Sequence, residues 1–173
     1  MVENNENVMR DINIEKITIN MGTGSDENAN TNAKKLITLI TNRTPVSTVS
    51  KKRNPSFKIS KGQKIGAMIT IRGNDTVPLV TKLLDAVDNK LKESAIRDNM
   101  VSFGIKEYID ISKVKYDPKI GMMGLNVNIT FKRKGNRVEL RKRKKGIIPN
   151  RHKIINREEI IKYLKDKFNV EII

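Results

Sequence analysis

The sequence predicts an α+β fold: a mixed or antiparallel sheet with helices packed on one face and the other face left open. Three segments alternate apolar and polar residues with a period of two, which is typical of half-buried strands. Three further segments carry apolar stripes at helical spacing. A sheet with one solvated face is usually antiparallel or mixed, so the helices can bury their stripes on its apolar side.

The predicted strands lie around residues 16–21, 65–72 and 125–132. Successive side chains of a strand point to opposite sides of the sheet. The apolar side is predicted to carry Ile17, Ile19 and Met21; Ile65, Ala67, Ile69 and Ile71; and Leu125, Val127, Ile129 and Phe131. The polar side is predicted to carry Lys16, Thr18 and Asn20; Met68, Thr70 and Arg72; and Asn126, Asn128, Thr130 and Lys132. The open face would therefore present amides, hydroxyls and cations to solvent.

The predicted helices lie around residues 33–40, 77–91 and 160–168. Their stripes are Ala33, Leu36, Ile37 and Ile40; Val77, Val80, Leu83, Leu84, Val87 and Leu91; and Ile160, Ile161, Leu164 and Phe168. Asn74 or Asp75 can cap the second helix. Asn156, followed three residues later by Glu159, resembles a capping box at the start of the third helix.

The length of 173 residues suits a single domain, which we place at residues 10–173 after a disordered tail over residues 1–9. The chain has no cysteine and one histidine, which excludes disulfides, thiolate chemistry and a multi-histidine metal site. No apolar run reaches the roughly 20 residues of a transmembrane helix. The polar, acidic N-terminus is unlike a signal peptide. We therefore expect a cytoplasmic protein that does not bind membranes.

The net charge of +16 is concentrated in two parts of the chain. Residues 31–64 contain nine bases and no acid, and residues 131–173 contain fifteen bases and five acids. Adjacent cations repel one another and become favourable when phosphates neutralise them and release counterions. This distribution favours a nucleic acid as the partner. The alternatives are a solvated loop or a localisation signal.

The first basic loop, over residues 51–62, contains one aromatic residue among its cations. Lys51, Lys52, Arg53 and Lys58 bracket Phe57 and the rigid Pro55. Phosphate contacts combined with one stacking ring are a common way of holding single-stranded or loop RNA. The alternative is that Phe57 is only the hydrophobic anchor of the loop.

The second basic loop is predicted over residues 134–151. Its candidate phosphate-binding residues, with the neighbouring histidine, are Arg137, Arg141, Lys142, Arg143, Lys144, Lys145, Arg151 and His152. His152 has bases and no acid nearby, which suits a phosphate contact better than general base catalysis. The polar strand faces are a further candidate surface, because amides and hydroxyls bind base edges and 2′-hydroxyls. Alternatively, those faces are polar only because they meet solvent.

No motif in the sequence assembles an active site or a cofactor site. Gly22-Thr23-Gly24 lacks the third glycine of a dinucleotide loop, so a glycine-rich turn is the better interpretation. Asp85 and Asp88, predicted to lie one turn apart on the long helix, are better explained as a solvated face than as a cation site. We expect a protein that is not an enzyme and that has no cofactor.

Several ordered motifs resemble one known family. They are Asn20-Met21-Gly22-Thr23-Gly24; Pro45-Val46 with Ser50-Lys51-Lys52 and Phe57-Lys58-Ile59-Ser60-Lys61-Gly62; Ile65-Gly66 with Thr70-Ile71-Arg72-Gly73; Ser102-Phe103-Gly104-Ile105; and Tyr116-Asp117-Pro118-Lys119-Ile120-Gly121. Over residues 8–173 the chain resembles the large-subunit ribosomal protein five family, in its archaeal and eukaryotic form. The resemblance implies a structural protein that binds 5S rRNA and large-subunit rRNA in the central protuberance.

The resemblance also implies roles for particular residues. Family contacts to 5S rRNA correspond to Asn20, Thr70 and Arg72, and Arg43 occupies the place of a fourth contact that is usually a glutamine. The family loop that reaches the P-site tRNA corresponds to residues 50–59, with Lys51, Lys52, Arg53, Asn54, Phe57 and Lys58. Neighbouring ribosomal proteins and a small-subunit bridge protein are further implied partners. The competing hypotheses are a nonspecific nucleic-acid-binding architectural protein and an RNA-modifying enzyme.

Overall fold

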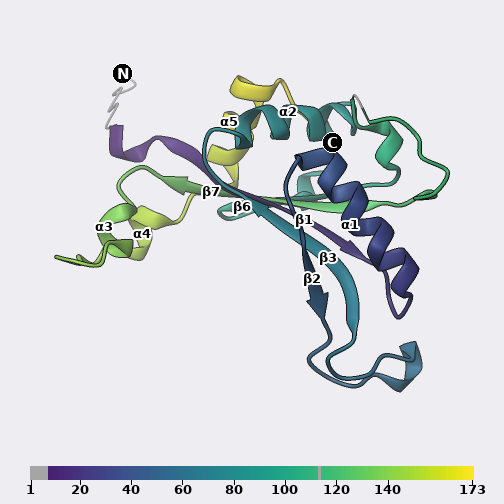
Figure 1. The fold of residues 1–173 in the computed structure, drawn as a ribbon. Helices are drawn as coiled ribbons and strands as arrows, with labels where there is room; N and C mark the ends of the chain where they lie inside the picture. The colour runs from purple at the N-terminus through teal and green to yellow at the C-terminus, as the bar shows by residue number, and fades with distance from the viewer. Residues whose placement is uncertain (1–7, 113) are drawn as a thin grey trace.

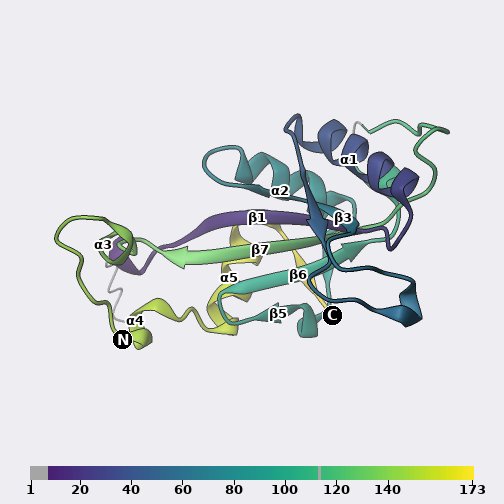
Figure 2. The same cartoon turned by 60° about the horizontal axis from the view of Figure 1, so that its bottom comes forward.

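The computed structural model describes residues 8–112 and 114–173, and it is built around one antiparallel sheet (Figure 1). The strands are β1 (Ile12–Gly22), β2 (Val46–Val49), β3 (Lys64–Ile71), β5 (Ile96–Arg97), β6 (Met100–Ile105) and β7 (Leu125–Arg133). They lie in the order β2-β3-β1-β7-β6-β5, and every neighbouring pair is antiparallel (Figure 2). The predicted α+β fold with an antiparallel sheet is confirmed.

Three helices cover one side of this sheet (Figure 1). They are α1 (Glu27–Thr41), α2 (Thr76–Asp85) and α5 (Arg157–Phe168). Two single-turn helices, α3 (Arg137–Leu140) and α4 (Asn150–Lys153), lie beyond the end of β7. Short 3-10 turns occur at Val8–Arg10, Pro55–Phe57, Glu93–Ala95 and Tyr108–Asp110, and β4 (Lys90–Leu91) pairs in parallel with β8 (Glu171–Ile172). Residues 1–7 of the predicted tail lie outside the described residues.

The core lies between the helices and the apolar side of the sheet. Ile17, Ile19, Met21, Ala67, Ile69, Ile71, Leu125, Val127, Ile129 and Phe131 are all buried, as the period-two pattern predicts. The ring of Tyr163 on α5 packs edge-on against Phe131, with ring centroids 5.7 Å apart. Burial raises the pKa of the Tyr163 phenol.

The first helix follows its predicted stripe, with Ala33, Leu36, Ile37 and Ile40 buried. Asp26 caps its start by accepting a hydrogen bond from the Asn28 amide (2.9 Å), and Asn42 ends it in a left-handed conformation. Asn30 is the polar member of the buried face. Its side-chain amide donates to the Gly66 carbonyl (3.0 Å), which joins α1 to β3.

The second helix is shorter than its apolar stripe predicts. It ends at Asp85, because Asp88 and Asn89 turn the chain with left-handed backbone angles, and Leu91 lies in β4. The prediction that Asp85 and Asp88 share a helical face is therefore wrong. Val77 points away from the core and is 52% exposed. Asp75 holds the N-cap position without a side-chain hydrogen bond to the helix, while the Thr76 hydroxyl donates to the Gly73 carbonyl (2.7 Å).

The third helix begins as predicted, but its capping box is wrong. Asn156 is the N-cap residue and makes no side-chain capping bond. The Glu159 carboxylate instead accepts two hydrogen bonds from the Arg133 guanidinium, at 2.7 and 3.1 Å. This ion pair fastens α5 to the end of β7. No helix of the described part is both long enough and apolar enough to cross a membrane.

Candidate nucleic-acid interface

The uncovered side of the sheet carries its polar side chains in rows that the strand register sets. In the central row, Thr18 of β1 lies opposite both Thr70 of β3 and Asn128 of β7, and Asn128 lies opposite Ser102 of β6. The hydroxyl oxygens of Thr18 and Thr70 are 3.4 Å apart. Directly opposed residues have Cβ atoms about 5 Å apart. The row is therefore a continuous line of hydroxyl and amide groups across four strands.

The next row contains the amides. Asn20 of β1 lies opposite Met68 of β3 and Asn126 of β7, and Asn126 lies opposite Gly104 of β6. Each amide can donate and accept hydrogen bonds. Within the described residues, neither the Asn20 side-chain amide nor that of Asn126 has a hydrogen-bond partner. This end of the open face therefore presents unused donors and acceptors.

Cations lie at the other end of the open face. Lys16 lies opposite Thr130, and Arg72 directly follows β3 at the position that continues its pairing with β1. Lys132 lies one step further along β7. No acidic residue holds a paired position on this side of the described sheet, although Glu15 lies at the bulge of β1. The face is therefore neutral and polar at one end and positively charged at the other.

Three of the four predicted 5S rRNA contacts lie together on this face. Asn20 and Thr70 occupy adjacent rows of β1 and β3, and Arg72 is exposed at the end of β3. The structure does not bring Arg43 to the same surface. Its guanidinium forms an ion pair with the Asp75 carboxylate, beside a hollow lined by the core residue Ile71.

The first basic loop is a hairpin arm that continues β2 and β3 away from the body (Figure 1). Ser50 and Gln63 begin the arm, with the Ser50 amide donating to the Gln63 carbonyl at 2.9 Å. Nearer the tip, Asn54 and Ile59 exchange two backbone hydrogen bonds at 2.8 and 3.0 Å. Lys58 makes the tight turn with a left-handed φ of 54°. These backbone contacts place the cations of the arm far from the sheet.

Every side chain of residues 51–58 is exposed. Phe57 is 69% exposed, so it does not anchor the loop in a hydrophobic contact. Pro55–Phe57 form a single 3-10 turn, which places Phe57 between the cations at positions 51–53 and Lys58 in the arm. An exposed ring among cations can stack on a base while the cations contact phosphates.

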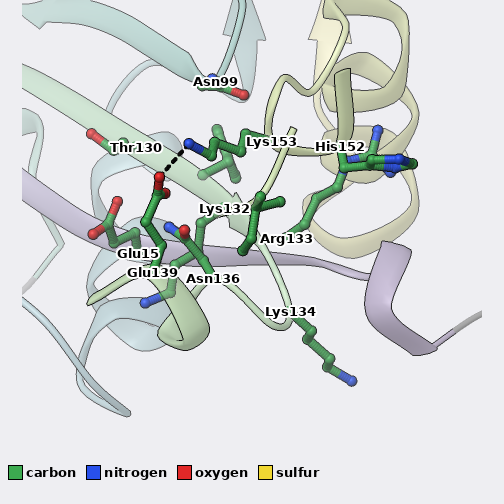
Figure 3. A pocket seen from close by; sticks show the side chains of 12 residues that line it. Glu15, Asn99, Thr130, Lys132, Arg133, Lys134, Asn136, Glu139, His152 and Lys153 are labelled. Carbon is green, nitrogen blue, oxygen red and sulfur yellow. Dashed lines mark hydrogen bonds and ion pairs between the residues drawn. The ribbon is translucent and has the colours of Figure 1, made fainter. Parts of the chain in front are cut away.

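The second basic tract is folded back beside the end of β7 (Figure 3). Lys134 pairs with Asp11 at 2.7 Å, and Lys153 reaches Glu139 at 2.5 Å across a hollow of about 250 Å³. The sequence predicts a loop over residues 134–151, and the structure places α3 within this range and the start of α4 at its end. Its central cations, at positions 141–145, are all exposed.

The remaining candidate residues of the tract are Arg137, Arg151 and His152, and all three are exposed. His152 lies at the rim of the hollow next to Lys153, and the hollow also contains Glu15 and Glu139 (Figure 3). In the part of the chain that the structure describes, no three His, Asp or Glu side chains gather in a way that could hold a metal ion. Nothing in this arrangement pairs His152 with an orienting carboxylate.

Residues of β6 and β7 complete the open face. The sequence did not identify any of them individually as a candidate RNA contact. Asn126 and Asn128 stand on the predicted polar side of β7, so the period-two pattern contained their signal. Ser102 gave no such signal, because it is the one polar side chain on the open side of the short strand β6, between Met100 and Gly104. The antiparallel register alone brings these side chains beside Asn20 and Thr18.

An open polar sheet face flanked by exposed basic segments is typical of proteins that bind nucleic acids. Comparison with known proteins defines the family. A model of "Ribosomal protein L5" matches residues 7–59, and a second model, which describes the C-terminus of the same ribosomal protein family, matches residues 64–163.

Several curated relatives named "Large ribosomal subunit protein uL5" are similar over nearly their whole length. The protein of Methanosphaera stadtmanae is 40% identical over 167 residues, which cover 96% of this chain and 99% of the relative. That of Nanoarchaeum equitans is 41% identical over 169 residues, covering 97% and 99%. That of Sulfolobus acidocaldarius is 41% identical over 170 residues, covering 97% and 94%.

The chain is thus of the ribosomal class of nucleic-acid-binding proteins. It belongs to the ribosomal protein L5 family. This confirms the resemblance predicted from the sequence motifs. The family consists of structural proteins of the ribosome and not of enzymes, and membership implies rRNA and other ribosomal proteins as partners.

Proposed function

We propose that the chain binds 5S rRNA through the open face of its sheet, in the central protuberance of the large ribosomal subunit. The observation that carries this proposal is the meeting of Asn20, Thr70 and Arg72 on one uncovered surface. Hydroxyl and amide groups suit base edges and 2′-hydroxyls, and Arg72 suits a phosphate. Rigid strands hold these groups in fixed positions, which favours recognition of RNA shape over simple charge attraction.

The two basic segments supply further contacts in this proposal. The exposed cations at positions 141–145, with Arg137, Arg151 and His152, bind phosphates of large-subunit rRNA. The hairpin arm binds the P-site tRNA through Lys51, Lys52, Arg53, Asn54, Phe57 and Lys58. Its projection from the body and the exposure of Phe57 support this role.

Neighbouring ribosomal proteins and a small-subunit bridge protein are further proposed partners. Leu39 and Ile120 line an open hollow of about 590 Å³ on the outer side of α1, and Leu39 is 56% exposed. Exposed apolar surface of this kind often marks a protein contact. The hollow supports a protein partner on the helix-covered side, opposite the RNA-binding face.

The experiment that tests the proposal is binding to an archaeal 5S rRNA transcript with excess duplex DNA and tRNA as competitors. Thr70→Ala combined with Arg72→Ala should weaken binding about tenfold or more, because it removes a base or sugar contact and a phosphate contact. The matched control is Thr81→Ala with Lys82→Ala, an exposed threonine and cation on α2. Affinity of the first double variant within about threefold of the parent chain would overturn the assignment of this face.

A nonspecific architectural protein is the second candidate, and the exposed run of cations at positions 141–145 favours it. Such a protein would bind duplex DNA as tightly as 5S rRNA, since phosphate contacts carry no sequence information. Loss of 5S rRNA binding in the presence of competitors would support this candidate. Binding that survives the competitors would support recognition of RNA shape.

A further inference from the structure

The end of the open face that carries Asn20 and Asn126, here called the amide end, contains a hollow. It has a volume of about 420 Å³ and lies at the ends of β1, β6 and β7. Asn20 and Asn126 line it, with Lys106 at its rim. Gly22, Gly104 and Gly124 also line it, together with the buried residues Met21, Ile105 and Leu125. The hollow therefore combines two side-chain amides with three glycines, which leave space beside those amides.

The two amides are held in place and have no partner within the described chain. Asn20 and Asn126 are directly opposed on β1 and β7, so the register keeps their Cβ atoms about 5 Å apart. Asn20 is half-buried and Asn126 is exposed at the mouth of the hollow. Together they offer two carbonyl acceptors and four N–H donors. A ligand with alternating donors and acceptors along one edge would satisfy both.

The glycines make room for a flat ligand beside these amides. A Cβ at Gly104 would lie 3.3 Å from the Asn126 side-chain oxygen, in the space that the hollow occupies. At Gly22 a Cβ would meet no atom within 4 Å, so its side of the hollow is open. Met68 of β3 is exposed and lies opposite Asn20, on the side away from Asn126. Its side chain offers the ligand an apolar contact there.

We infer that this hollow holds one unpaired nucleobase of the bound RNA, with Asn20 and Asn126 reading its edge. This inference rests on the proposed function and names what the amide end of the open face recognises. Protein readers of RNA commonly take bases that are splayed out of the stack and hydrogen-bond their edges. Lys106 at the rim would contact a phosphate adjoining that nucleotide.

The test uses full-length chain and an archaeal 5S rRNA transcript. Asn126→Ala should weaken binding about tenfold, as expected when an amide no longer pairs with a base. Gly104→Ala and Gly22→Ala should weaken it similarly by filling the hollow without changing charge. Asn28→Ala is the matched control, because Asn28 is an exposed asparagine at the start of α1. Urea unfolding of each variant checks that the fold is retained.

A set of 5S rRNAs, each lacking one unpaired base, identifies the ligand. At one nucleotide, removal of the base should weaken binding of the parent chain and should not weaken binding of Asn126→Ala any further. If the loss from removing the base and the loss from Asn126→Ala add at every nucleotide, the amides contact the RNA backbone and not a base. That result overturns the inference.

The outcomes also separate this inference from the proposed function. If Asn126→Ala binds within about twofold of the parent chain while the Thr70→Ala, Arg72→Ala variant loses binding, the hollow is not a base site and the proposed function stands. If that double variant also binds normally, the proposed function itself is overturned.

Discussion

The hairpin arm and the C-terminal basic tract are both rich in cations, but they are attached to the body differently. The arm is held by backbone hydrogen bonds between its own two strands, and none of its cations at 51, 52, 53 or 58 has an ion pair among the described residues. The tract is joined to the body by the ion pair of Lys134 with Asp11, and the ion pair of Lys153 with Glu139 holds α4 against α3 at its other end. Its middle, at positions 141–145, forms no ion pair within the described chain.

This difference separates cations that hold the fold from cations that are available to a ligand. Arg133 shows the first kind, since its side chain is only 15% exposed and is paired with Glu159. The arm and the middle of the tract show the second kind. Removing the two kinds should therefore change different measurements: the free energy of unfolding for the first and RNA affinity for the second.

The largest expected effect comes from replacing all five cations at positions 141–145 with glutamine. Binding to a large-subunit rRNA transcript should weaken at least tenfold at physiological salt. The slope of log affinity against log salt should fall by about 0.7–0.9 for each phosphate that the variant no longer binds. The measurement is a salt titration. The urea midpoint should stay unchanged, and a drop in it would show that these cations hold the fold.

A smaller but clear effect is expected on stability when Glu159 becomes glutamine. The change leaves the largely buried Arg133 guanidinium without its counter-charge, which should cost about 1–3 kcal/mol of unfolding free energy. Urea unfolding measures it. Glu158→Gln is the matched control, an exposed acid one residue earlier in α5. Equal losses in the two variants would contradict the role given to the Arg133 pair.

The smallest effect on the isolated protein is expected at the hairpin tip. Replacing Lys51, Lys52, Arg53 and Lys58 with glutamine, together with Phe57→Ala, should change the unfolding free energy by less than about 0.5 kcal/mol. Affinity for 5S rRNA should stay within about threefold. Binding of P-site tRNA to subunits that contain the variant should weaken. A large loss of 5S rRNA binding would show that the arm belongs to the 5S surface.

The three long strands β1, β3 and β7 could be predicted because their alternation is strict, whereas the short strands β2, β5 and β6 were not predicted. Ile17, Ile19 and Met21 are buried as expected, and Thr18 and Asn20 lie on the open side. The register could not be predicted, because β1 pairs with strands far away in the sequence and a bulge between Ile14 and Lys16 shifts its pairing with β7. The composition of each row of the open face therefore required the structure.

The errors in the helices have local physical causes. The apolar spacing continued past the end of α2, and nothing in that spacing revealed the left-handed turn at Asp88 and Asn89. The capping box failed because a tertiary partner, Arg133, took the Glu159 carboxylate. Arg43 lies apart from its expected companions because it follows the end of α1, where its guanidinium pairs with Asp75 at the start of α2. Side chains with a strong long-range partner are those that local patterns describe least well.

The structural role of Asn99 could not be predicted from the sequence either. It adopts a left-handed φ of 61°, its carbonyl accepts from the Phe131 amide (2.8 Å), and its side-chain oxygen accepts from the Ile155 amide (2.7 Å). One residue thus joins β6, β7 and the segment leading into α5. The sequence shows only an asparagine in a polar stretch, and its role depends on residues that are distant in the chain.

The position of β1 has a consequence for how the chain folds. β1 is the first strand to be synthesised, yet it lies inside the sheet between β3 and β7, and Ile17 pairs with both Ile71 and Ile129. Contacts between such distant residues form slowly, because the loop between them must close first. During synthesis, β1 keeps one unpaired edge until β7 has left the ribosome, and an unpaired edge can join other chains. We therefore expect folding to be completed late, and the nascent chain to depend on protection of that edge until then.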